Sequence, residues 1–423
     1  MSEAKVLFGK DNGFEFRIPS IVNAGGVLVA AADNGRSGRD WGYIELCVRR
    51  SADGGESWSE LKTIARPPAR STGSDIENTK SAFFIDPCMA VAPNGDIVML
   101  VTFFPESKGI HNMKYLEKKK IAFTRFDGIK CPIIYDRDGN YYIVLENGSV
   151  IDKKKAKTAY TLKGIGELYK GEEYIGNIYL NGAQGKAEEG TETTFGAPLK
   201  SPKRSYIFLL RSKDKGETWS EPRDITPSIL NEADGAFIGV SPGSGLTTEK
   251  GRILIPLYTE NGTVCIYSDD NGETWQRNQQ IPYTGNKDEW TMIEAPSGRI
   301  YGFGRDKGKI PATISFDHGI TWAKGDRPPI KAPKCQKNAI VIDDKVFLSH
   351  PSGKDRSDGV ISLGLFSRDK KGNFTGIRWS TQEIPINKTF FAYSCMAKID
   401  DSTIALLYEN KPSGEIVFKK IEL

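Results

Sequence analysis

An eight-residue motif that recurs four times constrains the fold of this chain more than any other feature. The pattern Ser-x-Asp-x-Gly-x-(Ser/Thr)-Trp occurs at residues 51–58, 212–219, 268–275 and 315–322. A looser fifth copy begins at Ser367, and its tryptophan is displaced to Trp379. Asp side chains cap backbone N–H groups in turns and Gly accepts a positive φ. Each copy therefore predicts a hairpin turn. The Trp ring of the motif is expected to pack on the preceding strand and hold the turn in place.

The spacing of the motifs predicts a β-propeller. Each copy follows a β-rich run, as in YIFLLRS before the second copy. The motif aspartates Asp214, Asp270, Asp317 and Asp369 follow one another at intervals of 56, 47 and 52 residues. These intervals are close to the roughly 40 to 50 residues of a four-stranded propeller blade. Asp53 lies 161 residues before Asp214, which we interpret as one blade without the motif plus an insertion of about a hundred residues.

The insertion is predicted at residues 105–203, between two parts of the propeller at 1–104 and 204–423. Strand-like pieces punctuated by glycine, such as NYYIVLENGSVI, indicate a small β-rich subdomain. Its lysine runs at 118–120 and 153–155 are interpreted as a solvated face. The predicted fold is therefore all-β, and the 44 glycines and 22 prolines are explained as the turns of repeated hairpins.

Composition excludes several classes of function. The net charge of +4 from 58 basic and 54 acidic residues gives no sign of a nucleic-acid-binding face. The three histidines lie far apart and the six cysteines form no C-x-x-C pair, so we expect no metal site, cofactor or disulfide framework. No apolar run reaches the roughly 18 residues of a membrane helix. The start, MSEAKVLFGK, lacks signal-peptide features, so we expect a cytoplasmic monomer, or a secreted or cell-surface protein if a signal was removed.

Four arginines at strand ends beside turn residues are candidates for a ligand site. They are Arg17 in FRIPS, Arg36 in NGRSGRD, Arg305 in GFGRD and Arg356 in KDRSDG. A propeller builds its site at the axial mouth from loops of several blades, so scattered functional residues are expected. Any one of these arginines taken alone is more simply interpreted as half of a surface salt bridge.

Taken together, the motif and the arginines resemble the catalytic domains of bacterial sialidases (neuraminidases) of glycoside hydrolase family 33. Phe16-Arg17-Ile18-Pro19 matches the Arg-Ile-Pro signature of that family, and the octapeptide matches its Asp box. The resemblance implies a six-bladed propeller. The predicted insertion is similar to the small inserted domain of large clostridial and streptococcal sialidases.

The resemblance also implies how sialic acid would be held and attacked. Arg17, Arg305 and Arg356 match the triad that binds its carboxylate, since guanidinium groups pair with carboxylates in a bidentate manner. Tyr393, in AYSCMAKID, matches the nucleophile. Glu409 matches the glutamate that braces the first arginine of the triad.

The remaining matches concern proton transfer and the sugar ring. Asp40 matches the acid/base residue, and Arg36 and Asp86 match residues that touch the ring substituents. Two glutamates in EWTMIEAPSGR, Glu289 and Glu294, compete as the base paired with the tyrosine. The family pattern favours Glu289.

The implied function is an exo-α-sialidase that releases terminal sialic acid from glycoproteins, glycolipids and oligosaccharides by a retaining double displacement. A neutral phenol suits this substrate because a carboxylate nucleophile would be repelled by the carboxylate on the anomeric carbon. Two alternatives stay open. An intramolecular trans-sialidase, which releases an anhydro sugar, can share the same residues, and a noncatalytic propeller that binds glycans would share the Asp boxes.

Overall fold

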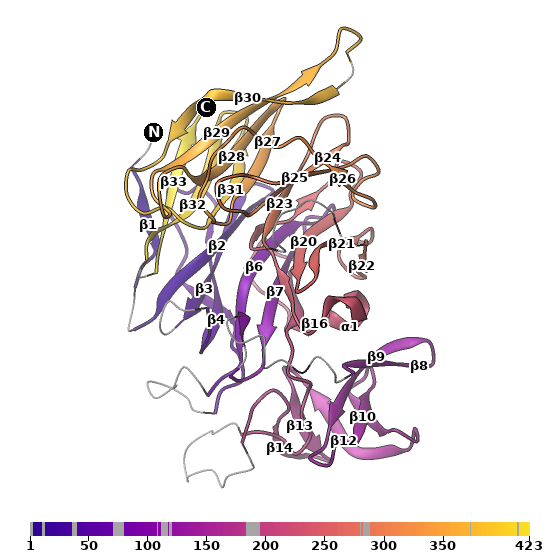
Figure 1. The fold of residues 1–423 in the computed structure, drawn as a ribbon. Helices are drawn as coiled ribbons and strands as arrows, with labels where there is room; N and C mark the ends of the chain where they lie inside the picture. Colours follow the sequence, from indigo (N-terminus) through magenta and orange to yellow (C-terminus); the bar gives the residue numbers. More distant parts are fainter. Residues whose placement is uncertain are drawn as a thin grey trace.

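The computed structural model describes residues 3–10, 13–35, 40–70, 80–107, 109–110, 117, 121–182, 195–279, 281, 288–372, 374–412 and 414–423. These residues form seven β-sheets. Six of the sheets are the blades of a propeller, and the seventh forms a lobe beside it (Figure 1). The prediction of an all-β, six-bladed propeller is therefore confirmed.

The first three blades contain most of the N-terminal half of the propeller. Blade 1 consists of β2 (Glu15–Ala24), β3 (Val27–Gly35), β4 (Ile44–Ser51) and β5 (Lys62–Ala65). Blade 2 consists of β6 (Phe83–Val91), β7 (Ile97–Phe104), β15 (Tyr206–Ser212) and β16 (Arg223–Asp224), with β18 (Gly243–Ser244) beside β6. Blade 3 consists of β17 (Ile238–Val240), β20 (Ile253–Thr259), β21 (Gly262–Ser268) and β22 (Gln276–Arg277), with β19 (Leu246–Thr247) beside β20. The helix α1 (Thr226–Ile229) and the short 3-10 helix η3 (Glu232–Asp234) connect blades 2 and 3.

The other three blades complete the ring. Blade 4 consists of β23 (Trp290–Glu294), β24 (Ile300–Gly304), β25 (Ala312–Ser315) and β26 (Ala323–Lys324). Blade 5 consists of β27 (Asn338–Ile342), β28 (Lys345–Pro351), β29 (Gly359–Arg368) and β30 (Phe374–Pro385). Blade 6 consists of β31 (Ser394–Asp400), β32 (Thr403–Lys411), β33 (Glu415–Glu422) and the N-terminal strand β1 (Lys5–Phe8). Because β1 pairs with β33, the two ends of the chain meet in one blade and close the ring.

The Asp boxes form the turns between the third and fourth strands of blades 1 to 4. In the second box, a carboxylate oxygen of Asp214 accepts a hydrogen bond from the Thr218 N–H at 2.8 Å, and the Ser212 hydroxyl accepts one from the Gly216 N–H at 2.7 Å. Gly216 has a φ of +84°, which an L side chain rarely adopts. The indole N–H of Trp219 donates back to the Gly216 carbonyl at 3.2 Å. The predicted turn chemistry is therefore present.

The prediction of a blade without the motif was wrong. The box at 212–219 lies between β15 and β16, so it belongs to blade 2. The seven-stranded sheet is inserted between the second and third strands of this blade, and it separates the first half of the blade from its own box. Counting along the chain therefore assigned the two halves of blade 2 to different blades.

The inserted sheet has the order β14-β13-β12-β11-β10-β9-β8. Its strands are β8 (Phe123–Phe126), β9 (Ile129–Tyr135), β10 (Tyr141–Val144), β11 (Ser149–Asp152), β12 (Lys157–Lys163), β13 (Glu167–Lys170) and β14 (Glu173–Asn177). It shares a hydrophobic core with blade 2, where the ring centroids of Phe103 and Tyr179 lie 4.8 Å apart. Residues 153–155 are exposed, whereas 118–120 lie outside the described residues. The domain boundaries at 105 and 203 stay a prediction.

Candidate functional site

The predicted site residues gather at one end of the propeller. In each blade the first strand begins, and the second strand ends, at the same end, because neighbouring strands are antiparallel. Arg17 lies near the start of β2, Asp86 near the start of β6, and Arg305 directly after β24. The Asp boxes follow the third strands, so they lie at the opposite end.

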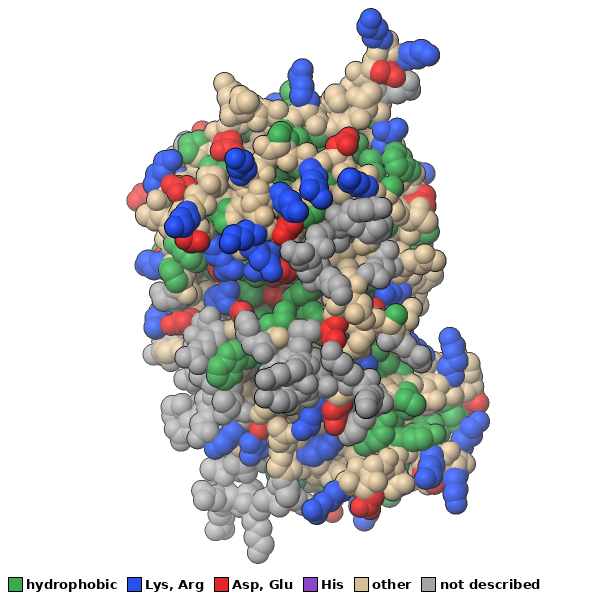
Figure 2. Space-filling model, in the orientation of Figure 1, with side chains coloured by type: hydrophobic (Ala, Val, Ile, Leu, Met, Phe, Trp, Pro, Cys, Tyr) green, Lys and Arg blue, Asp and Glu red, His purple; other side chains and the backbone are tan. Residues whose placement is uncertain are grey.

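A cavity of about 320 Å³ lies among these residues. Seven of the nine predicted residues line it: Arg17, Asp40, Asp86, Glu289, Arg305, Arg356 and Tyr393. The face drawn in Figure 2 has a hollow where hydrophobic and acidic side chains are visible, with basic side chains gathered above it. Arg36 lies outside the described residues. The cavity therefore combines three arginines with several carboxylates.

Tyr393 and Glu289 form a buried hydrogen-bonded pair. The Tyr393 hydroxyl donates to Glu289 Oε1 at 2.6 Å, and the two side chains belong to residues that are 7% and 4% exposed. Arg305 Nη1 donates to the Tyr393 hydroxyl at 2.7 Å and to Glu289 Oε2 at 2.5 Å. Burial and the charge of Glu289 raise the pKa of Tyr393 well above its ordinary value, although Arg305 opposes this. The phenol is therefore neutral and hydrogen-bonded to a carboxylate.

Glu294, the competing glutamate, lies at the far end of β23. Its Oε2 accepts a hydrogen bond from the Glu249 N–H at 2.8 Å, and it lines a different cavity from Tyr393. Burial raises the pKa of Glu294. The contact with Tyr393 belongs to Glu289.

The three arginines converge on the ring of Tyr393. The guanidinium carbons of Arg17, Arg305 and Arg356 lie 5.9, 5.7 and 5.5 Å from its centroid. Burial lowers the pKa of Arg17 and Arg305, but nearby carboxylates raise it more, so both remain charged. Three like charges this close favour the binding of an anion between them.

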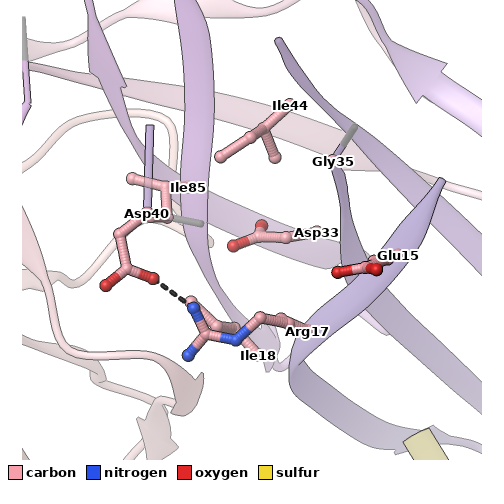
Figure 3. A pocket seen from close by; sticks show the side chains of 8 residues that line it. All are labelled: Glu15, Arg17, Ile18, Asp33, Gly35, Asp40, Ile44 and Ile85. Atoms are coloured by element: carbon pink, nitrogen blue, oxygen red, sulfur yellow. Dashed lines mark hydrogen bonds and ion pairs between the residues drawn. The ribbon is translucent and has the colours of Figure 1, made fainter. Parts of the chain in front are cut away.

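The partners of the three guanidinium groups differ. Arg17 forms an ion pair with Asp40 (Figure 3), and its Nε lies 3.4 Å from Glu409 Oε1. Arg305 pairs with Glu289. No described residue forms a hydrogen bond or ion pair with the Arg356 guanidinium. Arg356 is therefore the member of the triad with the most capacity for a further carboxylate.

Left-handed backbone at non-glycine residues helps to orient the site. Ile18, Asp86 and Arg356 have φ values of +57°, +66° and +67°. The pairing of β2 shifts register just after Arg17, and that of β6 shifts around Asp86. The Ile18 N–H donates to Glu409 Oε1 at 2.9 Å, which ties the first irregularity to the carboxylate that braces Arg17. Such bulges commonly redirect side chains beside binding sites.

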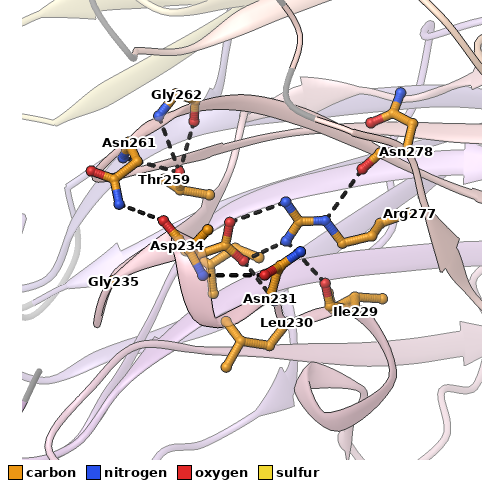
Figure 4. Close-up of polar contacts among 12 residues, drawn as sticks. Ile229, Leu230, Asn231, Asp234, Gly235, Thr259, Asn261, Gly262, Arg277 and Asn278 are labelled. Carbon is orange, nitrogen blue, oxygen red and sulfur yellow. Dashed lines mark hydrogen bonds and ion pairs between the residues drawn. The ribbon is translucent and has the colours of Figure 1, made fainter. Parts of the chain in front are cut away.

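The sequence did not single out the apolar wall of the cavity, which is lined by Ile85, Phe104, Ile110, Phe237 and Tyr258. Phe237 follows the segment that connects blades 2 and 3. Arg277 holds this segment by pairing with Asp234 and donating to the Ile229 carbonyl at 3.2 Å (Figure 4). These aromatic residues occur in ordinary strand-like runs, so no local signal distinguished them from core residues.

Two charged residues that line the cavity were also missed. Asp288 Oδ2 lies 2.8 Å from Lys334 Nζ and 3.8 Å from Arg305 Nε. The only local signal was that Asp288 directly precedes Glu289. Among the described residues, no group of three or more His, Cys, Asp or Glu side chains has the arrangement of a metal site. No helix in the described ranges has the length and hydropathy to cross a membrane.

Comparison with known proteins identifies the family. Residues 191–404 match the model of the BNR repeat-like domain. The chain belongs to the BNR-repeat sialidase family. Two curated proteins similar to this family member are the leech anhydrosialidase of Macrobdella decora, 28% identical, and sialidase B of Streptococcus pneumoniae, 25% identical. Each alignment covers 94% of this chain, but only 58% and 62% of the respective relative.

A solved structure supports the same fold for this member of the BNR-repeat sialidase family. The intramolecular trans-sialidase of Ruminococcus gnavus superposes with a TM-score of 0.82 at 22% identity. The superposition covers 99% of this chain and 97% of that chain. The propeller and its inserted sheet are therefore both present in that structure.

Proposed function

We propose that this chain is an exo-α-sialidase that hydrolyses terminal sialic acid from glycoconjugates, with Tyr393 as the nucleophile. The observation that carries the proposal is the buried hydrogen bond from the Tyr393 hydroxyl to Glu289, 2.6 Å long, inside a ring of three arginines. A nucleophile within hydrogen-bond reach of a base is the arrangement that covalent catalysis requires.

The arginines would bind the carboxylate of the sugar and place its anomeric carbon over Tyr393. The Arg356 guanidinium forms no hydrogen bond or ion pair with a described residue, whereas Arg17 and Arg305 each contact a carboxylate of the protein. A bidentate carboxylate bound by such groups is held in one orientation. The apolar residues that line the cavity would contact the less polar part of the sugar.

The first chemical step would form a bond between the Tyr393 oxygen and the anomeric carbon and break the glycosidic bond. The phenol proton passes to Glu289 as the new bond forms. A neutral phenol approaches the substrate without the repulsion that a carboxylate nucleophile would meet. Positive charge that develops at the anomeric carbon is stabilised by the adjacent substrate carboxylate.

Asp40 would give a proton to the departing oxygen and later take one from water, which completes a retaining double displacement. Its ion pair with Arg17 in this structure favours the ionised form. A substrate carboxylate would compete with Asp40 for the Arg17 guanidinium. Binding of the substrate would therefore release Asp40 and favour the protonated form that the first step needs.

An intramolecular trans-sialidase is the second candidate, because the chain is 28% identical to a leech protein named anhydrosialidase. In this reaction a hydroxyl group of the bound sugar, instead of water, attacks the anomeric carbon of the tyrosyl intermediate. The product is lighter than sialic acid by one water. The residues described above serve both reactions equally well.

Incubation with 3′- and 6′-sialyllactose, followed by mass spectrometry of the released sugar, tests the proposal. Free sialic acid that incorporates ¹⁸O from labelled water supports hydrolysis. A product lighter by one water replaces hydrolysis with intramolecular transfer. If neither sugar is cleaved although both bind, the chain is a noncatalytic glycan-binding propeller. Comparing the two substrates also reports linkage preference.

A further inference from the structure

A second, much smaller cavity lies beside the site and shares Arg17, Ile18, Asp40 and Ile85 with the larger one. It is lined by Glu15, Arg17, Ile18, Asp33, Gly35, Asp40, Ile44 and Ile85 (Figure 3). Its volume of about 10 Å³ is close to the minimum that a single water molecule needs. Asp33 lines this small cavity and not the larger one. Its carboxyl group points into the space between Asp40 and Arg17 in Figure 3.

Asp33 is buried, with 3% of its surface exposed, and its two oxygens differ. Oδ2 accepts a hydrogen bond from the Asp86 N–H at 3.2 Å. Oδ1 is buried and has no hydrogen-bond partner among the described residues. A buried polar atom without a partner is costly and calls for an explanation. The cost is lower for a neutral carboxyl group than for an ionised one, because a buried charge is more costly than a buried neutral polar group.

The hydrogen bond to Asp86 matters because of the backbone conformation there. Asp86 has a φ of +66° within the irregular part of β6. This region is uncommon for residues other than glycine, and surrounding contacts must hold it. Since Asp86 lines the larger cavity, the Asp33 carboxyl is one of the contacts that set its orientation.

The charges around Asp33 favour a neutral carboxyl group. Burial raises its pKa well above the ordinary value, and the charges of Asp40 and Glu409 raise it further, against the Asp86 N–H and Arg17. Glu15, which also lines the cavity, is paired with Lys10. Arg17 is already paired with Asp40 and lies near Glu409. An ionised Asp33 would therefore add a negative charge to the two carboxylates that already share Arg17.

We propose that Asp33 is a positioning residue that accepts the Asp86 N–H with Oδ2, holds Asp86 in its left-handed conformation and stays uncharged beside Asp40. The inference rests on the proposed sialidase function for its effect on catalysis. It assigns Asp33 no contact with the substrate. Its influence passes through the orientation of Asp86 and the charge beside Asp40.

Two substitutions separate this role from that of a carboxylate. Asp33→Asn keeps an acceptor for the Asp86 N–H, but it cannot ionise. Asp33→Ala removes the acceptor. We expect Asp33→Asn to match the wild type at acidic and neutral pH, and Asp33→Ala to raise KM about tenfold, the effect of one lost buried hydrogen bond. As the pH rises through the raised pKa, KM should increase in the wild type and stay constant in Asp33→Asn.

Turnover of a sialyllactose, measured as kcat and KM across pH, provides the test, and thermal unfolding shows that each variant is folded. A loss in Asp33→Asn as large as that in Asp33→Ala would overturn the proposal, and so would an unchanged KM in Asp33→Ala. Carbon-13 NMR of labelled aspartates gives a readout that needs no activity. The carboxyl resonance that is missing from the spectrum of Asp33→Asn belongs to Asp33. In the wild type, its chemical shift should remain in the protonated range at neutral pH. If that resonance is ionised, the inference fails even where turnover is normal, whereas a protonated resonance without turnover refutes only the proposed function.

Discussion

Aspartates at the two ends of the propeller, the end with the Asp boxes and the end with the candidate site, have opposite pKa shifts. At the box end, burial raises the pKa of Asp214, but hydrogen bonds from Thr218 and Ser212 together outweigh burial and lower the pKa to about 2. At the site end, burial raises the pKa of Asp86, and the charge of Glu289 raises it further. An exposed aspartate with local donors is therefore kept ionised, whereas a buried one among other carboxylates is kept neutral.

The backbone has residues at positive φ at both ends, but in different settings. In three of the boxes a non-glycine residue, such as Lys215, comes directly before the glycine at positive φ within a turn, whereas Ile18, Asp86 and Arg356 at the site end line the cavity. In the box at 212–219, the hydrogen bonds of the turn are formed between residues of the same box, so the box stabilises the fold without a ligand. The site end gathers strain and charge that the surrounding blades must hold, which is typical of a functional site. Substitutions at the two ends should therefore affect different properties.

Tyr393→Phe should have the largest effect on activity and little effect on the fold. It removes the nucleophilic oxygen but keeps the ring that the three arginines surround. We expect kcat for an α-sialoside to fall by at least about 10³-fold, as for removal of a covalent nucleophile. Steady-state kinetics measures the loss, and circular dichroism checks the fold. Turnover within a few-fold of the wild type would remove Tyr393 from the mechanism.

Glu289→Gln and Glu294→Gln form a matched pair at the two ends of β23. The first removes the base hydrogen-bonded to Tyr393, and we expect kcat to fall by about 10²- to 10⁴-fold, the usual range for general base catalysis. The second alters a glutamate whose partner is the Glu249 N–H, so kcat should change less than about threefold. That limit follows from small effects away from functional features. Equal losses in both variants would contradict the assignment of the base.

Prediction from the sequence was most complete where the structure is local. Each box contains its donors, acceptors and glycine within eight residues, so the turn chemistry could be derived from one copy. The site was predicted only through motifs, since Tyr393 and Glu289 lie 104 residues apart. Asp33 had no motif, because its role depends on a contact with Asp86 across 53 residues. The insertion hid the second half of blade 2 for the same reason, since strand pairing is not visible from spacing alone.

Trp275→Ala should produce the largest loss of stability at the box end. Trp275 is 4% exposed and packs in the core shared by blades 2 and 3, and its indole N–H donates to the Gly272 carbonyl at 3.0 Å. Replacement by alanine leaves a cavity, and we expect a loss of about 3–5 kcal/mol in the free energy of unfolding. Urea unfolding measures it. Turnover per folded molecule should be unchanged, and a selective loss of kcat would contradict the division between the two ends.

Asp214→Asn should have the smallest effect, and its sign depends on pH. The pKa of Asp214 is about 2 in the folded protein and 3.8 ordinarily, so its ionised form stabilises the fold above the ordinary value. This contribution is lost as the pH falls from about 4 toward about 2, when the folded protein also binds the proton. Because the side chain is exposed, solvent screening limits the contribution to about 1 kcal/mol or less. Urea unfolding of both proteins should therefore show a gap that narrows on acidification. At the site end we expect the opposite dependence of stability on pH. Because the pKa of Asp86 is raised in the folded protein, its contribution to the free energy of unfolding decreases as the pH increases. A gap between wild type and Asp214→Asn that stays constant with pH would show that the box carboxylate acts through turn geometry instead of through its charge.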